Sequence, residues 1–252
     1  MPRILITGCS SGFGHAIANR FAGEGWDVVA TMRVPQPDLF AGHDRIEVLP
    51  LDVTDAASIA HAVAQAGPLD ALLNNAGVGL LNALEGTDMD KARDVFETNV
   101  LGAIAMAKAV MPQFRARGAG VIVNVSSSVT LRPLPALSVY TASKAALNGF
   151  SESFAVEAAQ FGVTVRLVLP GSAPATSFGK NAVARMGFDI PEAYADFVHG
   201  YLTDLRSSPL STTPADVADS VWQAVTQPDA PAWIAAGADA EAWMRDAMPV
   251  GG

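Results

Sequence analysis

The sequence predicts an α/β fold in which a mostly parallel sheet of about seven strands is covered by helices on both faces. The first reason is that short apolar runs alternate with longer segments of helical period along nearly the whole chain. The second is that half of the 252 residues are hydrophobic and only 16% are charged, which is enough apolar material for a large core. No repeat, low-complexity tract or linker divides the chain, so we expect residues 1–252 to form a single doubly wound domain.

The expected strands are short and almost uniformly apolar. This composition is typical of parallel strands that are buried on both faces of a sheet. In chain order, the expected strands span residues 3–7, 27–32, 45–51, 69–74, 121–125, 163–169 and 233–235.

The expected helices lie between these strands, and two of them have clear start signals. Thr213 and Pro214 place a capping hydroxyl before a proline at the first helical position, with Asp216 in the first turn. Thr54 and Asp55 mark a second start. The expected helices span residues 13–24, 56–66, 88–117, 138–161 and 215–226, which implies right-handed crossovers between the strands.

Residues 172–212 interrupt this alternation. The stretch is long for a connection, lacks a clear strand and carries several aromatic and apolar side chains. Insertions of this length in a compact fold are commonly lids or binding loops, so we expect a substrate loop here.

Charge and composition exclude several classes of function. The chain has 16 basic and 25 acidic residues and a net charge of −9, so a basic face for nucleic acid is not expected. No uncharged apolar run approaches the ~18 residues of a membrane span. The four histidines lack metal-ligand spacing, and the single cysteine, Cys9, cannot form an internal disulfide. Because the first residues also lack signal-peptide features, we expect a cytoplasmic protein with no nucleic-acid, membrane or metal partner.

A glycine-rich turn follows the first expected strand, where residues 7–14 read TGCSSGFG. Glycines let the backbone turn sharply and approach a pyrophosphate, whose charge is then stabilised by free N–H groups at a helix start. An ordinary tight turn between a strand and a helix is the alternative. The location directly after the first strand of an alternating chain favours dinucleotide binding.

A polar turn, Asn74-Asn75-Ala76-Gly77, closes the fourth expected strand. Ligands of open parallel sheets bind at the carboxyl ends of the strands, so this turn is expected to face the same crevice as the glycine-rich turn. On its own the motif is equally compatible with a polar turn that only caps a strand.

Tyr140 and Lys144 lie four residues apart in an expected helix, so their side chains share one face. A neighbouring ammonium favours phenolate and lowers a tyrosine pKa from ~10, which makes the hydroxyl a usable acid or base. Ser127 lies 13 residues before Tyr140, in the serine cluster that ends the fifth expected strand. A partly exposed helix face explains such a pair alone, whereas the pair and the serine cluster together favour a catalytic site.

Taken together and in this order, the motifs resemble those of the short-chain dehydrogenase/reductase family, in its branch of about 250 residues. The resemblance covers essentially the whole chain and includes Asp52-Val53, Asn99 and Pro170-Gly171. It implies a Rossmann-type fold and an oxidoreductase that moves a hydride between a nicotinamide and a carbonyl or alcohol carbon. It also implies a homodimer or homotetramer formed through the helices at residues 102–117 and 138–161.

The same resemblance assigns roles to individual residues. Tyr140 exchanges a proton with the substrate oxygen, Lys144 lowers the pKa of Tyr140, and Ser127 holds the substrate oxygen. Asn99 fixes a water that links Lys144 to solvent. The implied cofactor-binding residues are Gly8, Ser10, Ser11, Gly12, Phe13, Gly14, Arg33, Asp52, Val53, Asn75, Ala76, Gly77, Tyr140, Lys144, Pro170, Gly171 and Thr176.

Two positions depart from the family's pattern. The glycine that often follows the catalytic serine by three positions is Thr130 here. The threonine usually found four residues after Gly171 is Ala175, and Thr176 comes one residue later. A one-residue insertion explains this offset and assigns the nicotinamide contact to Thr176.

The end of the second expected strand predicts a preference for NADP(H), with NAD(H) also usable. In dinucleotide folds an acid at this point binds the ribose 2′-hydroxyl and repels a 2′-phosphate. Met32 occupies the position eighteen residues beyond Gly14, and Arg33 follows it. A guanidinium can make paired charge-assisted bonds to a phosphate. The alternative is a solvated surface arginine.

We expect the substrate to be a ketone or secondary alcohol that is largely apolar around the reacting carbon. Three apolar groups are expected to converge on the mouth of the cleft, although any single member could simply pack the insertion against the sheet. They are Leu80, Leu81 and Leu84, then Leu131, Leu134 and Leu137, and in the insertion Phe178, Met186 and Phe188.

Two other functions are compatible with this kind of fold. A non-catalytic protein that senses nicotinamide nucleotides is one, and the presence of both Tyr140 and Lys144 argues against it. An epimerase or dehydratase of the family's extended branch is the other, and its chains are generally longer with a different glycine spacing.

Overall fold

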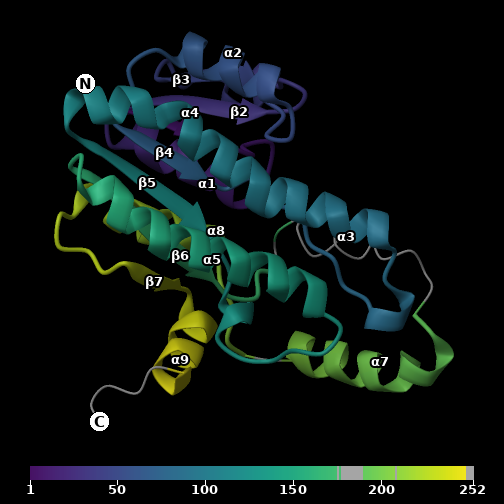
Figure 1. Ribbon diagram of the computed structural model, residues 1–252. Helices are drawn as coiled ribbons and strands as arrows, with labels where there is room; N and C mark the ends of the chain where they lie inside the picture. Colours follow the sequence, from purple (N-terminus) through teal and green to yellow (C-terminus); the bar gives the residue numbers. More distant parts are fainter. Residues whose placement is uncertain (175, 177–189, 208, 248–252) are drawn as a thin grey trace.

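The computed structural model describes residues 1–174, 176, 190–207 and 209–247. Within them, seven strands form one sheet in the order β3-β2-β1-β4-β5-β6-β7, and all neighbouring strands are parallel (Figure 1). The predicted doubly wound fold is confirmed, with a fully parallel sheet. The strand order reverses between β1 and β4, which is where ligands bind in such sheets. The strands are β1 (Arg3–Ile6), β2 (Asp27–Met32), β3 (Ile46–Pro50), β4 (Ala71–Asn74), β5 (Gly120–Val125), β6 (Val163–Pro170) and β7 (Trp233–Ala236).

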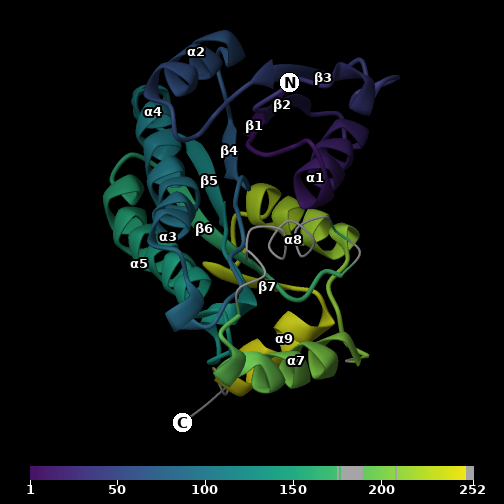
Figure 2. The same cartoon turned by 90° about the vertical axis from the view of Figure 1, so that its right-hand side faces the viewer.

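Helices cover both faces of the sheet (Figure 2). One face is covered by α1 (Gly12–Gly23) and α8 (Pro214–Thr226), and the other by α2 (Ala56–Ala66), α4 (Gly102–Arg117) and α5 (Ser138–Ala159). Each face has its own apolar cluster. Along β1, Ile4 and Ile6 pack into the cluster under α1 and α8, whereas Leu5 packs into the opposite one. Successive side chains of a strand point to opposite faces, so both sets must be apolar.

The helix starts follow the sequence signals. Thr213 caps α8 by accepting from the backbone N–H of Asp216, whose carboxylate accepts from the backbone N–H of Thr213, with Pro214 as the first helical residue. Asp55 caps α2 by accepting from the backbone N–H of Ala57. Both predicted starts are therefore confirmed.

The segment predicted as one helix over residues 88–117 consists of three consecutive pieces. The first piece, α3 (Met89–Phe96), passes into a π-helical turn at Glu97–Leu101 and then into α4. Hydrophobic periodicity does not reveal such a turn, because it adds a residue to a helix without interrupting it. Turns of this kind are common at functional sites, and Asn99 lies at the centre of this one.

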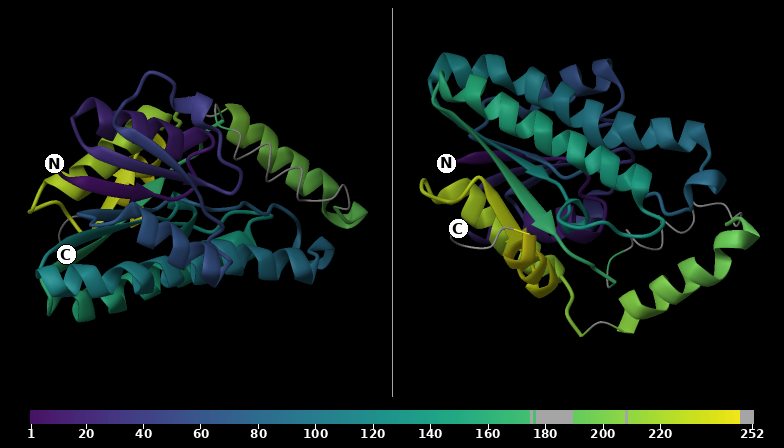
Figure 3. Two further views of the ribbon diagram at one scale, coloured as in Figure 1. Left: turned by 90° about the horizontal axis from the view of Figure 1, so that it is seen from above. Right: turned by 60° about the horizontal axis from the view of Figure 1, so that its bottom comes forward.

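Two further helices lie outside the predicted set. The insertion contains α7 (Glu192–Ser207), which projects beyond the carboxyl ends of the strands (Figure 3), and α9 (Ala238–Ala247) follows β7. The period of α7 is nevertheless present in the sequence, because Tyr194, Val198 and Tyr201 recur every three or four residues. Short 3₁₀ turns complete the described elements, at Pro37–Phe40, Leu84–Gly86 and Ser128–Thr130.

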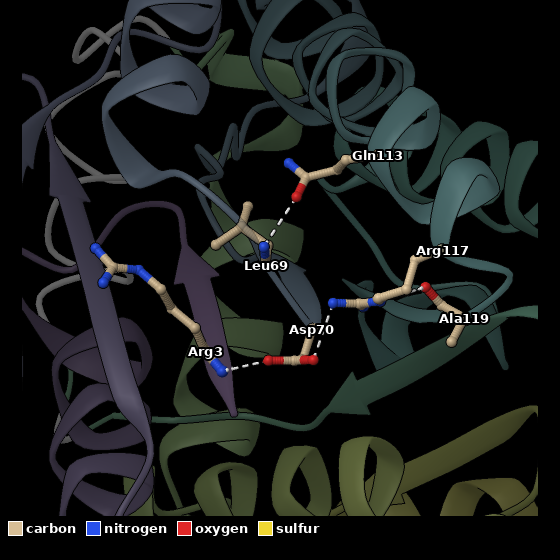
Figure 4. A network of polar contacts seen from close by, with 6 residues as sticks. All are labelled: Arg3, Leu69, Asp70, Gln113, Arg117 and Ala119. Carbon is tan, nitrogen blue, oxygen red and sulfur yellow. Dashed lines mark hydrogen bonds and ion pairs between the residues drawn. The ribbon is translucent and has the colours of Figure 1, made fainter. Parts of the chain in front are cut away.

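Asp70 ties together the amino ends of the central strands (Figure 4). Its carboxylate accepts from the backbone N–H of Arg3 at 2.7 Å and from Arg117 Nη1 at 3.0 Å, which joins β1 to the end of α4. Beside it, Gln113 Oε1 accepts from the backbone N–H of Leu69 at 2.8 Å. The sheet is thus anchored at the end opposite to the carboxyl ends of its strands.

None of the helices in the described part of the chain is long and apolar enough to cross a membrane.

Candidate active site

A cleft of about 1190 Å³ opens at the carboxyl ends of the strands. Because sites for one small ligand usually measure roughly 300–1,000 Å³, this cleft has room for more than one. Most residues expected in the site line it, whereas Gly14 and Asn99 do not. Those that line it are Gly8, Ser10, Ser11, Gly12, Phe13, Arg33, Asp52, Val53, Asn75, Ala76, Gly77, Ser127, Tyr140, Lys144, Pro170, Gly171 and Thr176.

The glycine-rich turn between β1 and α1 forms one end of the cleft. Gly8 and Gly12 have φ angles of 76° and 59°, which favour glycine. A Cβ on Gly14 would lie 2.3 Å from the carbonyl oxygen of Gly8, so a side chain there would displace the turn. The N-cap residue of α1, Ser11, makes no side-chain capping bond, and the first turn of this helix has no acidic residue. The turn therefore offers uncapped N–H groups to an anion.

The turn after β4 supports the glycine-rich turn from one side. Thr7 Oγ1 accepts from the backbone N–H groups of Asn75 and Ala76 at 3.0 and 2.9 Å. In return, Asn75 Nδ2 donates to the carbonyl oxygens of Thr7 and Gly8 at 2.9 and 3.1 Å. The Asn75 side chain thus fixes the backbone of the turn as well as lining the cleft.

Arg33 lies at the rim of the cleft, directly after the buried Met32 that ends β2. Its side chain is exposed and has no hydrogen-bond or ion-pair partner among the described residues. Nearby, hydrogen bonds from the backbone N–H and hydroxyl of Thr54 lower the pKa of Asp52, and the charge of Arg33 lowers it further. This rim therefore holds a free guanidinium beside a carboxylate that is already bonded to Thr54.

Three polar side chains meet at the centre of the cleft. The hydroxyls of Ser127, which follows β5, and Tyr140, in α5, are hydrogen-bonded to each other. Lys144 lies one helical turn after Tyr140, and its Nζ is 5.9 Å from the centroid of the tyrosine ring. The ammonium donates to the carbonyl oxygen of Val125 at 2.9 Å. Ser126 and Ser128 also line the cleft, but Ser127 is the serine bonded to Tyr140.

Burial shifts the pKa values of this group. Burial raises the pKa of Tyr140 to about 12, although the hydrogen bond with Ser127 lowers it in part. Burial also lowers the pKa of Lys144 to about 8. The expected low pKa of Tyr140 is therefore wrong for this structure, because the desolvation of a phenolate raises the pKa by more than the hydrogen bond with Ser127 lowers it. Tyr140 is protonated at neutral pH.

Asn99 connects the π-helical turn to the segment after β4. Its Oδ1 accepts from the backbone N–H of Val78 at 2.8 Å, and its Nδ2 donates to Val78 O at 2.9 Å and to Ser143 Oγ at 3.1 Å. A Cβ on Gly77 would lie 3.3 Å from Asn99 Oδ1 and 3.6 Å from Lys144 Nζ. Asn99 and Lys144 thus meet behind Gly77, and the amide of Asn99 is bonded to protein groups.

The insertion starts and ends at a buried side-chain tie. The carboxylate of Asp239, in α9, accepts from the backbone N–H of Ser172 at 2.6 Å and from Thr212 Oγ1 at 2.7 Å. The same hydroxyl accepts from the backbone N–H of Gly171 at 2.9 Å. A Cβ on Gly171 would lie 2.1 Å from Asp239 Oδ1, so the glycine leaves room for this carboxylate.

Thr176 is buried beside the glycine-rich turn. A Cβ on Gly12 would lie 3.7 Å from the Cβ of Thr176, and the Thr176 hydroxyl donates to Ala173 O at 2.8 Å. Ala175, the other candidate for this position, lies outside the described residues.

Apolar side chains line part of the cleft, but fewer than expected. Leu80, Leu81, Leu134 and Leu137 line it, whereas Leu131 does not and Leu84 is 68% exposed to solvent. The expectation for Leu84 and Leu131 is wrong: Leu84 lies in an exposed 3₁₀ turn, and Leu131, which follows the 3₁₀ turn Ser128–Thr130, is not among the lining residues. The expectations for Phe178, Met186 and Phe188 fall on residues outside the described part of the chain.

Sequence reasoning missed two aromatic lining residues. Trp243 of α9 and Tyr201 of α7 line the cleft, and the guanidinium carbon of Arg132 lies 4.0 Å from the centroid of a Trp243 ring. The helical period of α7 could have indicated Tyr201, whereas the short α9 offered no comparable signal. Among the described residues, no three His, Cys, Asp or Glu side chains form a group that could hold a metal ion.

Comparisons with known proteins agree with this arrangement. The family model of the short chain dehydrogenases matches residues 2–186. The oxidoreductase YusZ of Bacillus subtilis is 37% identical over 236 residues, which cover 88% of this chain and 84% of YusZ. Human retinol dehydrogenase 8 is 37% identical over 217 residues, which cover 81% of this chain and 69% of the human enzyme.

Solved structures with similar folds include relatives that hold a nicotinamide cofactor. A short-chain dehydrogenase from Streptomyces avermitilis is 35% identical with a TM-score of 0.85, over 97% of this chain and 91% of that one. A serine dehydrogenase complexed with NADP⁺ is 26% identical with a TM-score of 0.82, over 94% of this chain and 95% of that one. The chain therefore belongs to the short-chain dehydrogenase family of oxidoreductases.

Proposed function

We propose that the protein is an NADP(H)-preferring oxidoreductase that interconverts a carbonyl and a secondary alcohol in a largely apolar substrate. The observation that carries this proposal is the hydrogen-bonded pair Tyr140 and Ser127, beside the buried Lys144, in the same cleft as an uncapped glycine-rich helix start. A proton donor, a hydroxyl that can hold an oxygen and an anion site are the groups that this reaction needs.

The glycine-rich turn and Arg33 fit a dinucleotide that carries a 2′-phosphate. Gly8, Gly12 and Gly14 of the turn have no room or no suitable backbone angle for a Cβ, so the backbone is open to a pyrophosphate at these positions. Arg33, which has no hydrogen-bond or ion-pair partner in the part of the chain that the structure describes, fits an added phosphate at the rim, and no acidic side chain ends β2. When bound, a nicotinamide would supply or accept the hydride for which the chain has no group of its own.

Tyr140 acts as the proton donor in the direction of carbonyl reduction. Its high pKa keeps the hydroxyl protonated at neutral pH, and its bond with Ser127 sets the two hydroxyls side by side, where both can donate to one carbonyl oxygen. The O–H bond of Tyr140 breaks as the new alcohol O–H bond forms, which leaves a phenolate. The ammonium of Lys144 and the hydroxyl of Ser127 stabilise that phenolate.

Alcohol oxidation is the reverse of this proton transfer, and the phenolate of Tyr140 is then the base. Because burial raises the pKa of Tyr140, the reactive form is scarce at neutral pH and becomes more abundant as the pH rises. The oxidation rate is therefore expected to increase from pH 7 toward pH 8, where Lys144 still carries its proton, whereas the reduction rate is not.

An apolar substrate is supported by the leucines and by the aromatic residues Tyr201 and Trp243 that line the cleft. The name of one relative, retinol dehydrogenase 8, also refers to a largely apolar alcohol. We further propose a homodimer or homotetramer in the cytoplasm. Exposed apolar side chains at the start of α4 (Leu101) and in α5 (Val156) support an oligomer that buries these helices.

Ketone reduction by Tyr140→Phe and Ser127→Ala tests this function. Each variant removes one hydroxyl, so we expect the free energy of unfolding and NADPH binding to be kept, while kcat for bulky ketones falls at least ~100-fold. Ser128→Ala, at the neighbouring serine, is expected to have a milder effect. Turnover would be followed at the absorbance of the reduced cofactor.

Three outcomes would contradict the proposal in whole or in part. Full activity of Tyr140→Phe would exclude Tyr140 as the proton donor. NADPH binding by the wild-type protein without turnover of any ketone or alcohol would favour the nucleotide-sensing alternative. Faster turnover of small charged keto acids than of bulky ketones would contradict the apolar substrate alone.

A further inference from the structure

We propose that Asn148 and Thr130 are positioning residues, which hold the backbone around Ser127 so that its hydroxyl meets Tyr140. The inference rests on the function proposed above, since it assumes that Ser127 takes part in the reaction. Neither Asn148 nor Thr130 lines the cleft, so both would act through Ser127 rather than touch the substrate.

The Asn148 side chain bridges the two sides of Ser127. It lies on α5 one helical turn after Lys144 and is only 5% exposed. Its Oδ1 accepts from the hydroxyl of Ser126 at 2.5 Å, and its Nδ2 donates to the hydroxyl of Thr130 at 3.1 Å. The helix that carries Tyr140 and Lys144 is therefore also hydrogen-bonded directly to the residues on either side of Ser127.

Thr130 completes this bridge from the other side. Its hydroxyl donates to the carbonyl oxygen of Ser127 at 2.9 Å while it accepts from Asn148. The segment from Ser127 onward is a single 3₁₀ turn, in which Ser127 Oγ also accepts from the backbone N–H of Val129 at 3.3 Å. Thr130 therefore joins the backbone of Ser127 to the side chain of Asn148 through one hydroxyl.

The three hydrogen bonds form a chain in which each group donates to the next. The Ser126 hydroxyl donates to Asn148, the Asn148 amide donates to Thr130, and the Thr130 hydroxyl donates to the Ser127 carbonyl. The amide of Asn148 supplies both the acceptor and the donor that this chain of bonds needs, whereas alanine supplies neither. In a buried site, the loss of one member leaves its neighbours without partners, so the bonds act as a unit.

A second buried polar pair on the same helix provides a matched control. Ser151 Oγ accepts from Asn124 Nδ2 at 2.8 Å and donates to the carbonyl oxygen of Leu147 at 2.7 Å. Neither Ser151 nor Asn124 lines the cleft, and Ser151 makes no bond to residues 126–130. Ser151→Ala therefore removes a buried hydrogen bond between α5 and β5 without touching the Ser127 segment.

The test compares kcat, the KM of the ketone, the KM of the cofactor and the unfolding temperature across five proteins. They are the wild type, Thr130→Val, Asn148→Ala, the double variant and Ser151→Ala, all as full chains. We expect Thr130→Val and Asn148→Ala each to lower kcat about tenfold with little change in the KM of the cofactor. We expect the double variant to lose little more than either single variant, because both break the same chain of bonds.

Conservative and control variants separate positioning from stability. Thr130→Ser keeps the hydroxyl and is expected to restore kcat, whereas Ser151→Ala is expected to lower the unfolding temperature and keep kcat. If Asn148→Ala does not fold, the pair Thr130→Val and Thr130→Ser decides the question alone. Wild-type kcat in Thr130→Val, or additive losses in the double variant, would overturn the inference. Its failure is distinct from that of the proposed function, which Tyr140→Phe tests.

Discussion

The two walls of the cleft are held in different ways. The nucleotide wall, at the ends of β1 and β4, depends on backbone contacts, because Gly8 and Gly14 leave no room for a Cβ and Asn75 bonds to the carbonyls of the turn. The insertion wall, after β6, depends on the carboxylate of Asp239 and the hydroxyl of Thr212, which hold its two ends. The nucleotide wall therefore needs side chains to be absent at Gly8 and Gly14 as well as the amide of Asn75, whereas the insertion wall depends on a buried carboxylate and hydroxyl.

This difference decides where substitutions should act. On the nucleotide wall a single added methyl group is expected to abolish cofactor binding while the rest of the molecule stays folded. On the insertion wall the loss of the Asp239 carboxylate is expected to lower both stability and substrate affinity, because this group bonds to both ends of the insertion, at Ser172 and Thr212.

Gly14→Ala is expected to have the largest effect. The added Cβ would lie 2.3 Å from Gly8 O and 2.6 Å from Asn75 Nδ2, so the turn must move. We expect NADPH binding, measured by calorimetry, to weaken about 1,000-fold, which is about 4 kcal/mol. Gly23→Ala in the same helix is the control, because nothing lies within 4 Å of its added Cβ. Equal NADPH affinity in Gly14→Ala and the wild type would contradict the account of this wall.

Asp239→Ala is expected to be next in size. It leaves the half-buried N–H of Ser172 and the buried hydroxyl of Thr212 without their charged acceptor, at a cost of about 3 kcal/mol in the free energy of unfolding. The KM of the ketone is expected to rise about tenfold, because Gly171 and Ser172, at the start of the insertion, line the cleft and lose this support. Asp216→Ala, which removes the carboxylate half of the capping box of α8, should cost only about 1 kcal/mol and leave KM unchanged. Equal losses in the free energy of unfolding and equal changes in the ketone KM for Asp239→Ala and Asp216→Ala would contradict a specific role of Asp239 at the ends of the insertion.

The sequence predicted the nucleotide wall well and the insertion wall poorly, for a physical reason. Glycines at fixed spacing after a strand are visible within a few residues, as at Gly8, Gly12 and Gly14. The tie of Asp239 to Ser172 joins residues 67 positions apart, and no local pattern marks either partner. The strands were predicted within about two residues because burial on both faces leaves uniformly apolar runs, whereas α7 was not predicted although Tyr194, Val198 and Tyr201 give it a helical period.

Lys144→Met is expected to raise the free energy of unfolding at pH 7 while it lowers the rate of ketone reduction. Burial lowers the pKa of Lys144 from 10.5 to about 8, so at pH 7 the folded state carries a desolvated ammonium that the unfolded state keeps in water. The shift of about 2.5 pKa units sets an upper figure of about 3 kcal/mol for the gain in the free energy of unfolding when Met replaces Lys144 at pH 7. Ketone reduction is nevertheless expected to fall at least ~100-fold.

The pH dependence of this difference checks its cause. Between pH 8 and 10.5 the folded wild type loses the Lys144 proton while the unfolded chain still holds it, so the free energy of unfolding of the wild type rises relative to the variant. Urea unfolding of both proteins at pH 7 and pH 10 should therefore show the difference closing. A variant that is less stable than the wild type at pH 7 would mean that the bond of Lys144 to Val125 O outweighs desolvation.

Sequence reasoning found the reacting side chains but not their environment. Tyr140 and Lys144 were identified from a four-residue spacing, yet the expected low pKa of Tyr140 was wrong because burial is a property of the packed cleft. Asn148 is likewise invisible in the sequence, since its partners Ser126 and Thr130 lie 22 and 18 residues away. Spacing along a helix is a local property, whereas desolvation and buried bonds arise only when distant segments meet.

Arg33→Ala is expected to have the smallest effect, at the outer rim of the nucleotide wall. The exposed Arg33 can pair with a 2′-phosphate, but Asp52 nearby stays ionised at neutral pH and repels the same phosphate. The two effects partly cancel, so we expect the KM of NADPH to rise only about tenfold and the KM of NADH to stay nearly unchanged. Arg45→Ala is the control, because Arg45 pairs with Asp27 at the opposite end of the sheet. Neutralising the carboxylate in Asp52→Asn should lower the KM of NADPH. A wild-type protein that uses NADH more efficiently than NADPH would contradict the cofactor preference, while the roles of Tyr140 and Ser127 would stand.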